Sequence, residues 1–397
     1  MDFENNKTEL ISKSKLLSGK RIVLGVTGSI AAVEDVKLIH ELRRHGAIVF
    51  PVMTQSAMKI IHPYSLQYAS ENEVVTEITG RIEHVTLVNN SDLILIAPAT
   101  ANTISKAANG IDDTTVTSVL SNAIGRKPII MVPAMHQGMM DNPILKENMQ
   151  NLIKNGVVFL DPIIEENKAK MADIEYITAS VIRVLNPLCI GKKVAVVGGS
   201  SAEPIDDVRV ITNLSSGETT VSFMKAFYYF GAELHNYLGL MRTQVPSYLK
   251  YESFKTVDDL ISLIPKIREN DLVIVPAALS DFTLKKQSGK ISSEEELNLK
   301  LFPAKKFLKE LGRNYDGILI GFKAEYGVSE KDLINRAKKR LEEYNLDYII
   351  ANRLEDVKHA NTIVYLIGEN IVEKFKGDKD DVSISIVKKL CESLFPR

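Results

Sequence analysis

The stretch that decides the fold is His84–Asn102, which reads His-Val-Thr-Leu-Val-Asn-Asn-Ser-Asp-Leu-Ile-Leu-Ile-Ala-Pro-Ala-Thr-Ala-Asn. Its centre, Leu93–Ala97, is a continuous apolar run, which is typical of a strand buried on both faces of a parallel sheet. The run stops at Pro98, and the small and polar residues Ala99–Asn102 lead into a segment that can form a helix. In an open α/β sheet, ligands bind beyond the carboxyl ends of the strands. We therefore expect a flat or phosphorylated ligand at Ala99–Asn102.

His84 precedes this strand, at the end of a segment that we expect to be helical. Histidine titrates near neutral pH and is a common general base. A lone histidine is nevertheless more often an ordinary structural residue, so the pattern by itself leaves both interpretations open.

The composition is that of an ordinary globular protein. The chain has 397 residues, of which 45% are hydrophobic and 25% charged, and this length predicts two or more domains. A formal net charge of −1 excludes the global basic field of a nucleic-acid-binding protein. The polar first residues do not resemble a signal peptide, and no apolar run reaches the length of a membrane span. We expect a cytoplasmic protein without membrane or nucleic-acid partners.

The two cysteines, Cys189 and Cys391, lie far apart in the sequence. This usage fits a reducing cytoplasm, and it excludes a disulfide framework or a four-cysteine zinc site.

The first half of the chain starts with residues 1–18, which we expect to form a polar arm or a short lead-in helix. The predicted strand Ile22–Val26 follows, then the turn Thr27–Ser29 and an amphipathic helix to about His45. A Gly-Ser turn before a helix can bind an anion, but a plain turn with a capping serine is an equally good interpretation.

Further strands are predicted in the first half at Gly46–Met53, Lys127–Val132 and Gly156–Leu160. The turn Pro133–Met140 carries several methionines, which are adaptable side chains suited to a flat cofactor or to packing. We expect the charged segment Glu165–Asp173 to be mobile.

Gly191–Ser200 repeats the sequence pattern at the start of the first half, an apolar strand followed by a glycine-containing turn. We therefore predict a polar arm at 1–18 and two α/β domains of related architecture at 19–186 and 187–397. Later elements are a helix at Glu218–Tyr229, strands at Val208–Ile211, Val273–Pro276, Gly317–Glu325, Leu346–Asn352 and Thr362–Ile367, and a charged helix at Glu330–Tyr344.

Two features of the second half suit a nucleotide. Asn213–Gly217 lies at a helix start, where it can cap the helix or bind phosphates. Asp281 follows a buried strand and precedes Lys285, Lys286 and Lys290. The carboxylate could hold a metal ion or a hydroxyl and the lysines could meet phosphates, although a solvated lysine run is the better interpretation for Lys285 or Lys286 alone.

Together these residues resemble the bifunctional family of coenzyme A biosynthesis in which a phosphopantothenoylcysteine decarboxylase is fused to a phosphopantothenate–cysteine ligase. The resemblance covers residues 20–395 and implies two Rossmann-like α/β domains with mainly parallel sheets, a flavodoxin-like flavoprotein domain followed by a ligase domain. Its motifs are Gly28–Ala32, His84, Ala97–Asn102, Pro133–Met135, Asn213–Gly217, Ala277–Phe282, Lys290–Ile291, Gly321–Phe322 and Ala351–Asn352.

For the first domain the resemblance implies an FMN-dependent cysteine decarboxylase. His84 matches the catalytic base, and Met135 and His136 match substrate-binding positions. The residues implied at the flavin are Gly28, Ser29, Ile30, Thr54, Ala99, Thr100, Ala101 and Asn102.

For the second domain the resemblance implies that 4'-phosphopantothenate reacts with CTP and that cysteine captures the acyl-cytidylate, with Mg²⁺ or another divalent cation at unspecified ligands. Asn213 matches a catalytic residue that handles the acyl intermediate. The implied nucleotide-binding residues are Ser215, Ser216, Gly217, Asp281, Lys290, Pro303, Lys305, Phe322, Arg340 and Tyr344. The family implies a homo-oligomer, a dodecamer of decarboxylase trimers joined by ligase dimers.

Three departures from the family pattern indicate an archaeal-like branch. His136 replaces an asparagine, Glu165–Asp173 lacks the cysteine of the bacterial flap, and Glu218-Thr-Thr replaces Lys-Met-Gly. Lys170 is a candidate for the proton donor that the missing cysteine leaves open. The alternatives are an enzyme that retains one of the two activities and a flavin-binding regulatory subunit; an NAD-dependent oxidoreductase is disfavoured because the glycine fingerprint is missing.

Overall fold

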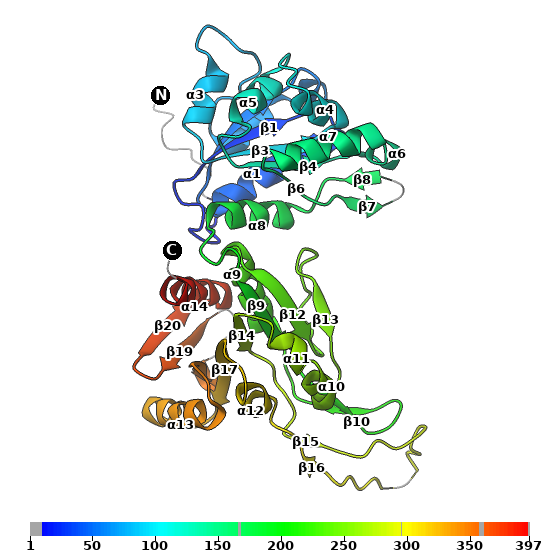
Figure 1. Cartoon of the computed structure of the whole chain (residues 1–397), viewed down its shortest axis with the longest axis vertical. Coiled ribbons are helices and arrows are strands. Elements are labelled where there is room, and N and C mark those ends of the chain that lie inside the picture. Colours follow the sequence, from blue (N-terminus) through cyan, green and yellow to red (C-terminus); the bar gives the residue numbers. More distant parts are fainter. Residues whose placement is uncertain (1–9, 166–167, 295, 357–360, 396–397) are drawn as a thin grey trace. The chain divides into compact units, whose positions relative to one another are not determined.

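The computed structural model describes residues 10–165, 168–294, 296–356 and 361–395. The chain divides into two compact units, Met1–Asn186 and Pro187–Arg397, each built on its own sheet (Figure 1). No helix in the described ranges is long and apolar enough to cross a membrane.

The first unit is built on a five-stranded parallel sheet with the order β2-β1-β3-β4-β6. All seven residues of the central strand β3 are buried, as its continuous apolar sequence predicts. The order reverses between β1 and β3, so the connections from these two strands leave in opposite directions and open a crevice at their carboxyl ends. The strands are β1 (Arg21–Val26), β2 (Ile48–Met53), β3 (Leu93–Ala99), β4 (Ile129–Pro133) and β6 (Val157–Phe159).

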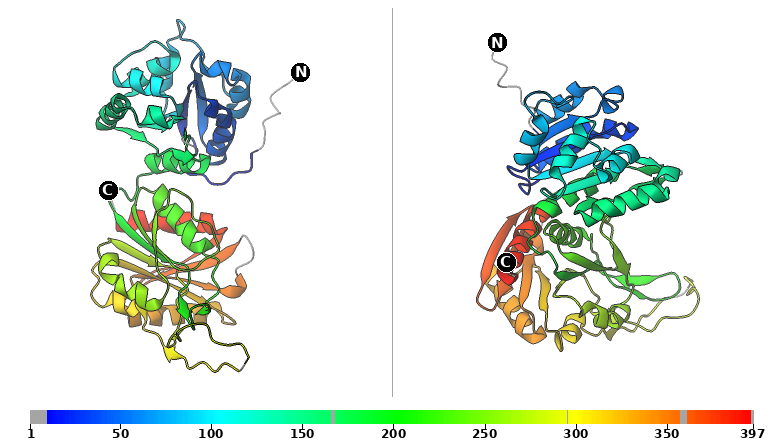
Figure 2. Two further views of the ribbon diagram at one scale, coloured as in Figure 1. Left: turned by 90° about the vertical axis from the view of Figure 1, so that its right-hand side faces the viewer. Right: turned by 45° about the horizontal axis from the view of Figure 1, so that its top comes forward.

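Helices cover both faces of this sheet (Figure 2). One face carries α1 (Asp35–Arg44), α2 (Pro63–Ser70) and α8 (Ile174–Leu185). The other face carries α3 (Glu83–Asn89), α4 (Ala101–Ala108), α5 (Thr115–Ala123) and α7 (Pro143–Lys154). Short helices η1 (Ile30–Glu34), η2 (Ala57–Lys59) and α6 (Gln137–Met140) lie in the connections.

The second unit is built on an eight-stranded sheet with the order β13-β12-β9-β14-β17-β18-β19-β20, in which only β19 and β20 pair antiparallel with their neighbours. Helices α9 (Glu218–Tyr229) and α14 (Lys379–Leu394) cover one face, and α10 (Val257–Ser262), α11 (Ile264–Ile267), α12 (Phe307–Gly312) and α13 (Glu330–Tyr344) cover the other. The strands are β9 (Lys193–Gly198), β12 (Glu233–Leu238), β13 (Tyr251–Ser253), β14 (Leu272–Val275), β17 (Ile318–Glu325), β18 (Tyr348–Arg353), β19 (Thr362–Gly368) and β20 (Val372–Gly377). Two short antiparallel pairs, β10 (Ala202–Pro204) with β11 (Val210–Thr212) and β15 (Phe282–Thr283) with β16 (Phe302–Pro303), lie outside the sheet.

The predicted fold class, two α/β domains with mainly parallel sheets, is confirmed. Several local details differ from the expectations. Within Glu165–Asp173, the segment expected to be mobile, Glu165 ends strand β7 (Ile163–Glu165) and Lys168–Lys170 form strand β8, which pairs with β5 (Met135–His136), distant in sequence. His84 lies at the start of α3 and not at a helix end. Of the two alternatives for residues 1–18, a polar arm or a lead-in helix, the helix is absent from the described part, residues 10–18, where Leu17 is buried; residues 1–9 lie outside the described residues.

The cysteine expectation was also wrong. Cys189 and Cys391 form a disulfide with their Cα atoms 5.7 Å apart. Separation along the sequence did not predict separation in space, because α14 packs against α9 and returns to the start of the second unit.

Candidate functional site

The carboxyl ends of β1 and β3 are fixed to each other by Thr27. Its hydroxyl donates to the Pro98 carbonyl at 2.6 Å and accepts from the Thr100 backbone N–H at 3.2 Å. Thr100 also caps α4, since its hydroxyl accepts from the Thr103 backbone N–H at 3.4 Å. The predicted ligand-binding turn therefore has a defined backbone at the crevice between the two strands.

A cavity of about 360 Å³ lies at this crevice. Gly28 is required in its wall, because an added Cβ would stand 2.6 Å from the Ser56 Cβ. Ser29 caps η1 by accepting from the Ala31 backbone N–H at 3.4 Å. The lining residues are Gly28, Ser29, Thr54, Ser56, Thr100, Ala101, Asn102, Thr103, Lys106, Thr114, Thr117, Ala134, Met135, His136 and Met139.

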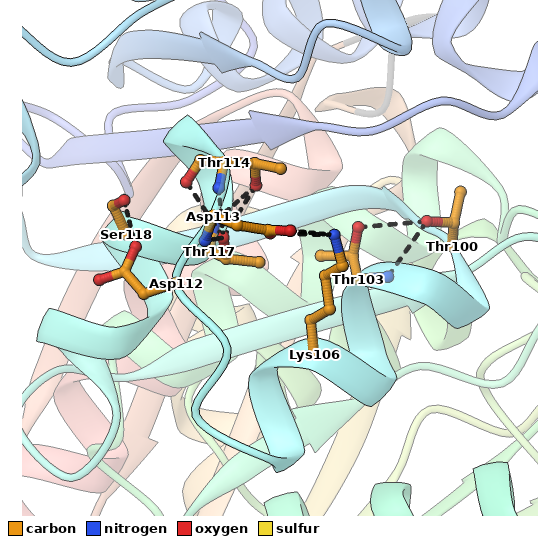
Figure 3. Close-up of polar contacts among 8 residues, drawn as sticks. All are labelled: Thr100, Thr103, Lys106, Asp112, Asp113, Thr114, Thr117 and Ser118. Atoms are coloured by element: carbon orange, nitrogen blue, oxygen red, sulfur yellow. Dashed lines mark hydrogen bonds and ion pairs between the residues drawn. The ribbon is translucent and has the colours of Figure 1, made fainter.

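The lining of the smaller cavity includes several hydroxyl groups and one lysine; Figure 3 shows Thr100, Thr103, Lys106, Thr114 and Thr117 with their polar contacts. The Lys106 ammonium lies 2.6 Å and 2.9 Å from the two carboxylate oxygens of Asp113. Thr114 and Thr117 form the capping box of α5. A cavity with this many hydroxyls and a neighbouring ammonium offers hydrogen bonds to a phosphate or a polyhydroxylated chain.

A second, larger cavity of about 840 Å³ is more apolar. It shares Ser29, Ala134, Met135 and His136 with the smaller cavity, so the two spaces meet at the turn after β4. The other lining residues are Ile30, Ala31, Val33, Glu34 and the flap segment Ala169–Ile174, which includes Lys170.

Most residues expected at the flavin therefore lie together. Gly28, Ser29, Thr54 and Thr100–Asn102 line the smaller cavity, and Ile30 lines the larger one. Ala99 is fully buried in β3 and lines neither. The expected substrate residues Met135 and His136 line both cavities.

His84 is not among the residues that line either cavity of its own chain. It is half-buried on α3, where its backbone carbonyl accepts from the Asn122 side chain at 3.5 Å, and Figure 1 shows α3 on the far side of the first unit from β7 and β8. Its Nδ1 is buried and has no hydrogen-bond partner among the described residues.

In the second unit, Asn213 is tied to the segment that follows β14. Its side-chain N–H group donates to the carbonyls of Ala278 and Leu279, at 3.3 Å and 3.0 Å. Ser215, Ser216 and Gly217 follow it and lead into α9. Gly217 has a φ of +83°, a conformation that favours glycine.

Asp281 lies beyond the carboxyl end of β14, as predicted. Phe282 pairs with Pro303 across β15 and β16, and the Ala304 backbone N–H donates to the Asp281 carbonyl at 2.9 Å. The cation that contacts the Asp281 carboxylate is Lys306. Lys305, which the sequence favoured, lies 3.8 Å from Asp258 instead.

Lys290 is exposed on a loop that two aspartates anchor. Its neighbours Gly289 and Ile291 donate their backbone N–H groups to Asp207 and Asp206, at 2.8 Å and 3.1 Å. Burial of the Asp206 carboxylate raises its pKa, but three backbone N–H donors and Arg209 lower it further, to about 2. The carboxylate that anchors the loop is therefore ionised at neutral pH.

The remaining predicted nucleotide-binding residues do not all lie at the carboxyl end of the sheet near Asp281. Phe322 lies towards the carboxyl end of β17, with its ring packed edge-on against Phe223 at 5.5 Å. Arg340 stacks over Tyr344 at the C-terminal end of α13, next to the amino end of β18. Arg340 and Tyr344 therefore lie at the amino end of the parallel strands, whereas Asp281 lies at the carboxyl end. A single chain does not bring these two residues to the nucleotide site proposed at Asp281.

Sequence reasoning missed several residues at these places. In the first unit they are Ser56, Thr103, Lys106, Thr114, Thr117 and Met139, and in the second unit Lys306. Their signal in the sequence was weak because threonine, serine and lysine are common in turns and on exposed helices. Within the described ranges there is no group of three or more His, Cys, Asp or Glu side chains that could hold a metal ion.

Comparison with known proteins assigns both units. Residues 10–186 match the family described as Flavoprotein, and residues 189–394 match the DNA/pantothenate metabolism flavoprotein C-terminal domain. The chain is 46% identical to the coenzyme A biosynthesis bifunctional protein CoaBC of Thermococcus kodakarensis, over 91% of this chain and 92% of that protein. It is 44% identical to the protein of the same name from Methanocaldococcus jannaschii, over 96% and 95%, and 32% identical to that from Bacillus subtilis, over 94% and 95%. The chain belongs to the family of coenzyme A biosynthesis bifunctional proteins, with a flavoprotein domain followed by the DNA/pantothenate metabolism C-terminal domain.

Proposed function

We propose that this protein joins cysteine to 4'-phosphopantothenate with CTP in its second unit and decarboxylates the product to 4'-phosphopantetheine with FMN in its first unit. The observation that carries the proposal is the convergence of Gly28, Ser29, Thr54 and Thr100–Asn102 on one cavity at the β1/β3 crevice. We propose that the protein acts in the cytoplasm.

The cavities of the first unit suit FMN. The smaller cavity is lined by several hydroxyl groups and Lys106, and the larger cavity is more apolar, which suits a phosphorylated chain attached to a flat ring. The absence of a side chain at Gly28 leaves room beside Ser56 for close backbone approach to the phosphate. The residues that line these cavities would hold FMN, which would supply two-electron redox chemistry at the thiol end of the substrate.

The protein groups would bind and orient the substrate. His136 can donate a hydrogen bond to the substrate carboxylate, and Met135 offers an adaptable apolar surface. His84 would accept the substrate proton, a role that suits a half-buried imidazole.

Because His84 does not line the cavity of its own chain, the proposal requires a homo-oligomer in which a second copy supplies it. Ile30 and Val33, at the larger cavity, are 77% and 46% exposed in the single chain, which suits coverage by another copy. The family resemblance favours trimers of this unit, joined into a dodecamer through dimers of the ligase unit. Light scattering tests this assembly, and a monomer would contradict it.

In the second unit, the carboxylate oxygen of 4'-phosphopantothenate would attack the α-phosphorus of CTP, and the bond from that phosphorus to the β-phosphate oxygen would break. Pyrophosphate leaves, and the amine of cysteine then attacks the acyl carbon and releases CMP. Asn213 would hold the acyl group, and Asp281, Lys290 and the Ser215–Gly217 turn would hold the nucleotide.

A divalent cation such as Mg²⁺ would enter this unit with the triphosphate. The described carboxylates do not form a metal site of their own, since Asp281 faces a lysine. No step above depends on protein ligands to the metal.

The test is to incubate the purified protein with CTP, cysteine and 4'-phosphopantothenate and to follow each product separately. We expect a yellow protein that forms CMP, pyrophosphate, CO2 and 4'-phosphopantetheine. Formation of CMP without CO2 would contradict the assignment of the decarboxylase to the first unit. If CO2 were released only when phosphopantothenoylcysteine is supplied, the assignment of the ligase to the second unit would be contradicted.

A further inference from the structure

The contact between Lys306 and Asp281 lies on the surface of the second unit. The Asp281 side chain is 74% exposed and that of Lys306 is 42% exposed. An exposed ion pair of this kind adds little to stability, because water solvates both charges well. The stability of the unit therefore gives no strong reason for the pair.

The backbone that brings the two residues together is nevertheless well fixed. The Ser280 backbone N–H donates to the Ser201 hydroxyl at 2.9 Å, and the Ala304 backbone N–H donates to the Asp281 carbonyl at 2.9 Å. Asn213 holds the preceding carbonyls. Lys306 thus has a defined place beside the segment that Asn213 contacts, although 25 residues separate it from Asp281 in the sequence.

Two neighbouring lysines are directed elsewhere. Lys286 lies 2.5 Å from Asp207, and Lys305 lies 3.8 Å from Asp258. In the described part of this region, Lys306 is the lysine for which a contact with Asp281 is observed.

We propose that Lys306 is a triphosphate-binding residue of the ligase unit, and that the nucleotide separates it from Asp281. The multiple negative charge of a triphosphate competes well with one exposed carboxylate for the ammonium group. Asp281, once released, accepts a hydrogen bond from an amino or hydroxyl group of the same nucleotide. This inference rests on the proposed nucleotide site at Asp281 and adds the residue that recognises the phosphates.

The test compares Lys306→Gln, Lys306→Arg and Lys309→Gln in the full-length protein. Lys309 is an exposed lysine on α12 and serves as the matched control. We expect Lys306→Gln to raise the dissociation constant and the KM for CTP about tenfold, the usual effect of losing one charge-assisted hydrogen bond, and to leave the KM for cysteine unchanged. The dissociation constant of CMP should rise by less, and Lys306→Arg should retain most of the CTP affinity.

Calorimetry gives the dissociation constants independently of turnover. Unchanged CTP binding in Lys306→Gln would overturn the inference, as would an equal loss of CTP and CMP affinity. A wild-type protein that binds no CTP would contradict the proposed function of the unit itself.

A second measurement avoids the variants altogether. Acetylation of the wild-type protein with a lysine-reactive reagent, read by mass spectrometry, should slow at Lys306 when CTP is present and continue at Lys309. Equal acetylation of Lys306 with and without saturating CTP would overturn the inference.

Discussion

Cys189 and Cys391 are joined by a disulfide although 202 residues separate them in the sequence. Cys189 lies shortly before β9 and Cys391 lies in α14, so the bond connects the two ends of the second unit. Both side chains are buried. The bond therefore closes nearly the whole ligase unit into one covalent loop.

Reduction of this bond should destabilise the second unit. A crosslink that closes so long a loop restricts the unfolded chain, and the expected loss is about 3–5 kcal/mol in free energy of unfolding. Urea unfolding with and without reductant measures it. Cys391→Ser should behave like the reduced wild-type protein, and superimposable curves for the oxidised and reduced protein would contradict the prediction.

His84→Asn should abolish CO2 release and leave CMP formation intact, because the two reactions belong to different units. Asparagine cannot accept the substrate proton at neutral pH, although it preserves much of the side-chain volume. Product assays on the full chain measure both reactions. His62→Asn is the matched control, since His62 caps α2 and asparagine is also a good capping residue. Loss of both products in His84→Asn would disprove the division of labour.

Gly28→Ala should yield a protein that binds little flavin. The added Cβ would stand 2.6 Å from the Ser56 Cβ, so the turn must move at the point where we propose the phosphate. The visible absorbance of the purified protein, relative to its concentration, measures the bound flavin. Gly80→Ala is the control, because nothing lies within 4 Å of the added atom there. Full flavin content in Gly28→Ala would place the phosphate elsewhere.

Asp35→Asn should stabilise the first unit increasingly as the pH rises. Burial, and secondly the charge of Glu34, raise the pKa of Asp35 well above its ordinary value of 3.8, and both carboxylate oxygens have no hydrogen-bond partner among the described residues. Above about pH 4 the unfolded chain releases this proton while the folded protein keeps it, so the wild-type protein loses stability as the pH rises towards the folded pKa. Asparagine does not titrate and avoids this loss.

Thermal melting of the two proteins at several pH values tests this effect. The curves should nearly coincide at about pH 3, where both states of the wild-type protein are protonated, and separate at about pH 7. A constant difference across this range would show that Asp35 does not keep its proton on folding.

The sequence by itself determined the elements whose signal is local. Leu93–Ala97 had to be a buried strand because a continuous apolar run fits a parallel sheet covered on both faces, although the strand continues to Ala99. Helix α13 (Glu330–Tyr344) could be predicted to the residue because its charged and apolar positions follow the helical period. The motifs Thr27–Ser29 and Thr100–Asn102 at the strand ends could also be predicted from the sequence, because each follows an apolar run directly.

Only the tertiary structure decided the pairings between distant segments. Strand β8 forms because Met135–His136 lies beside it, Lys306 rather than Lys305 contacts Asp281, and Cys391 returns to Cys189. The tertiary structure also placed His84 away from the cavities of its own chain, and Arg340 at the opposite end of the parallel strands from Asp281. Which partner a side chain reaches depends on the packing of helices and the register of strands, and a linear pattern of apolar and polar residues leaves that choice open.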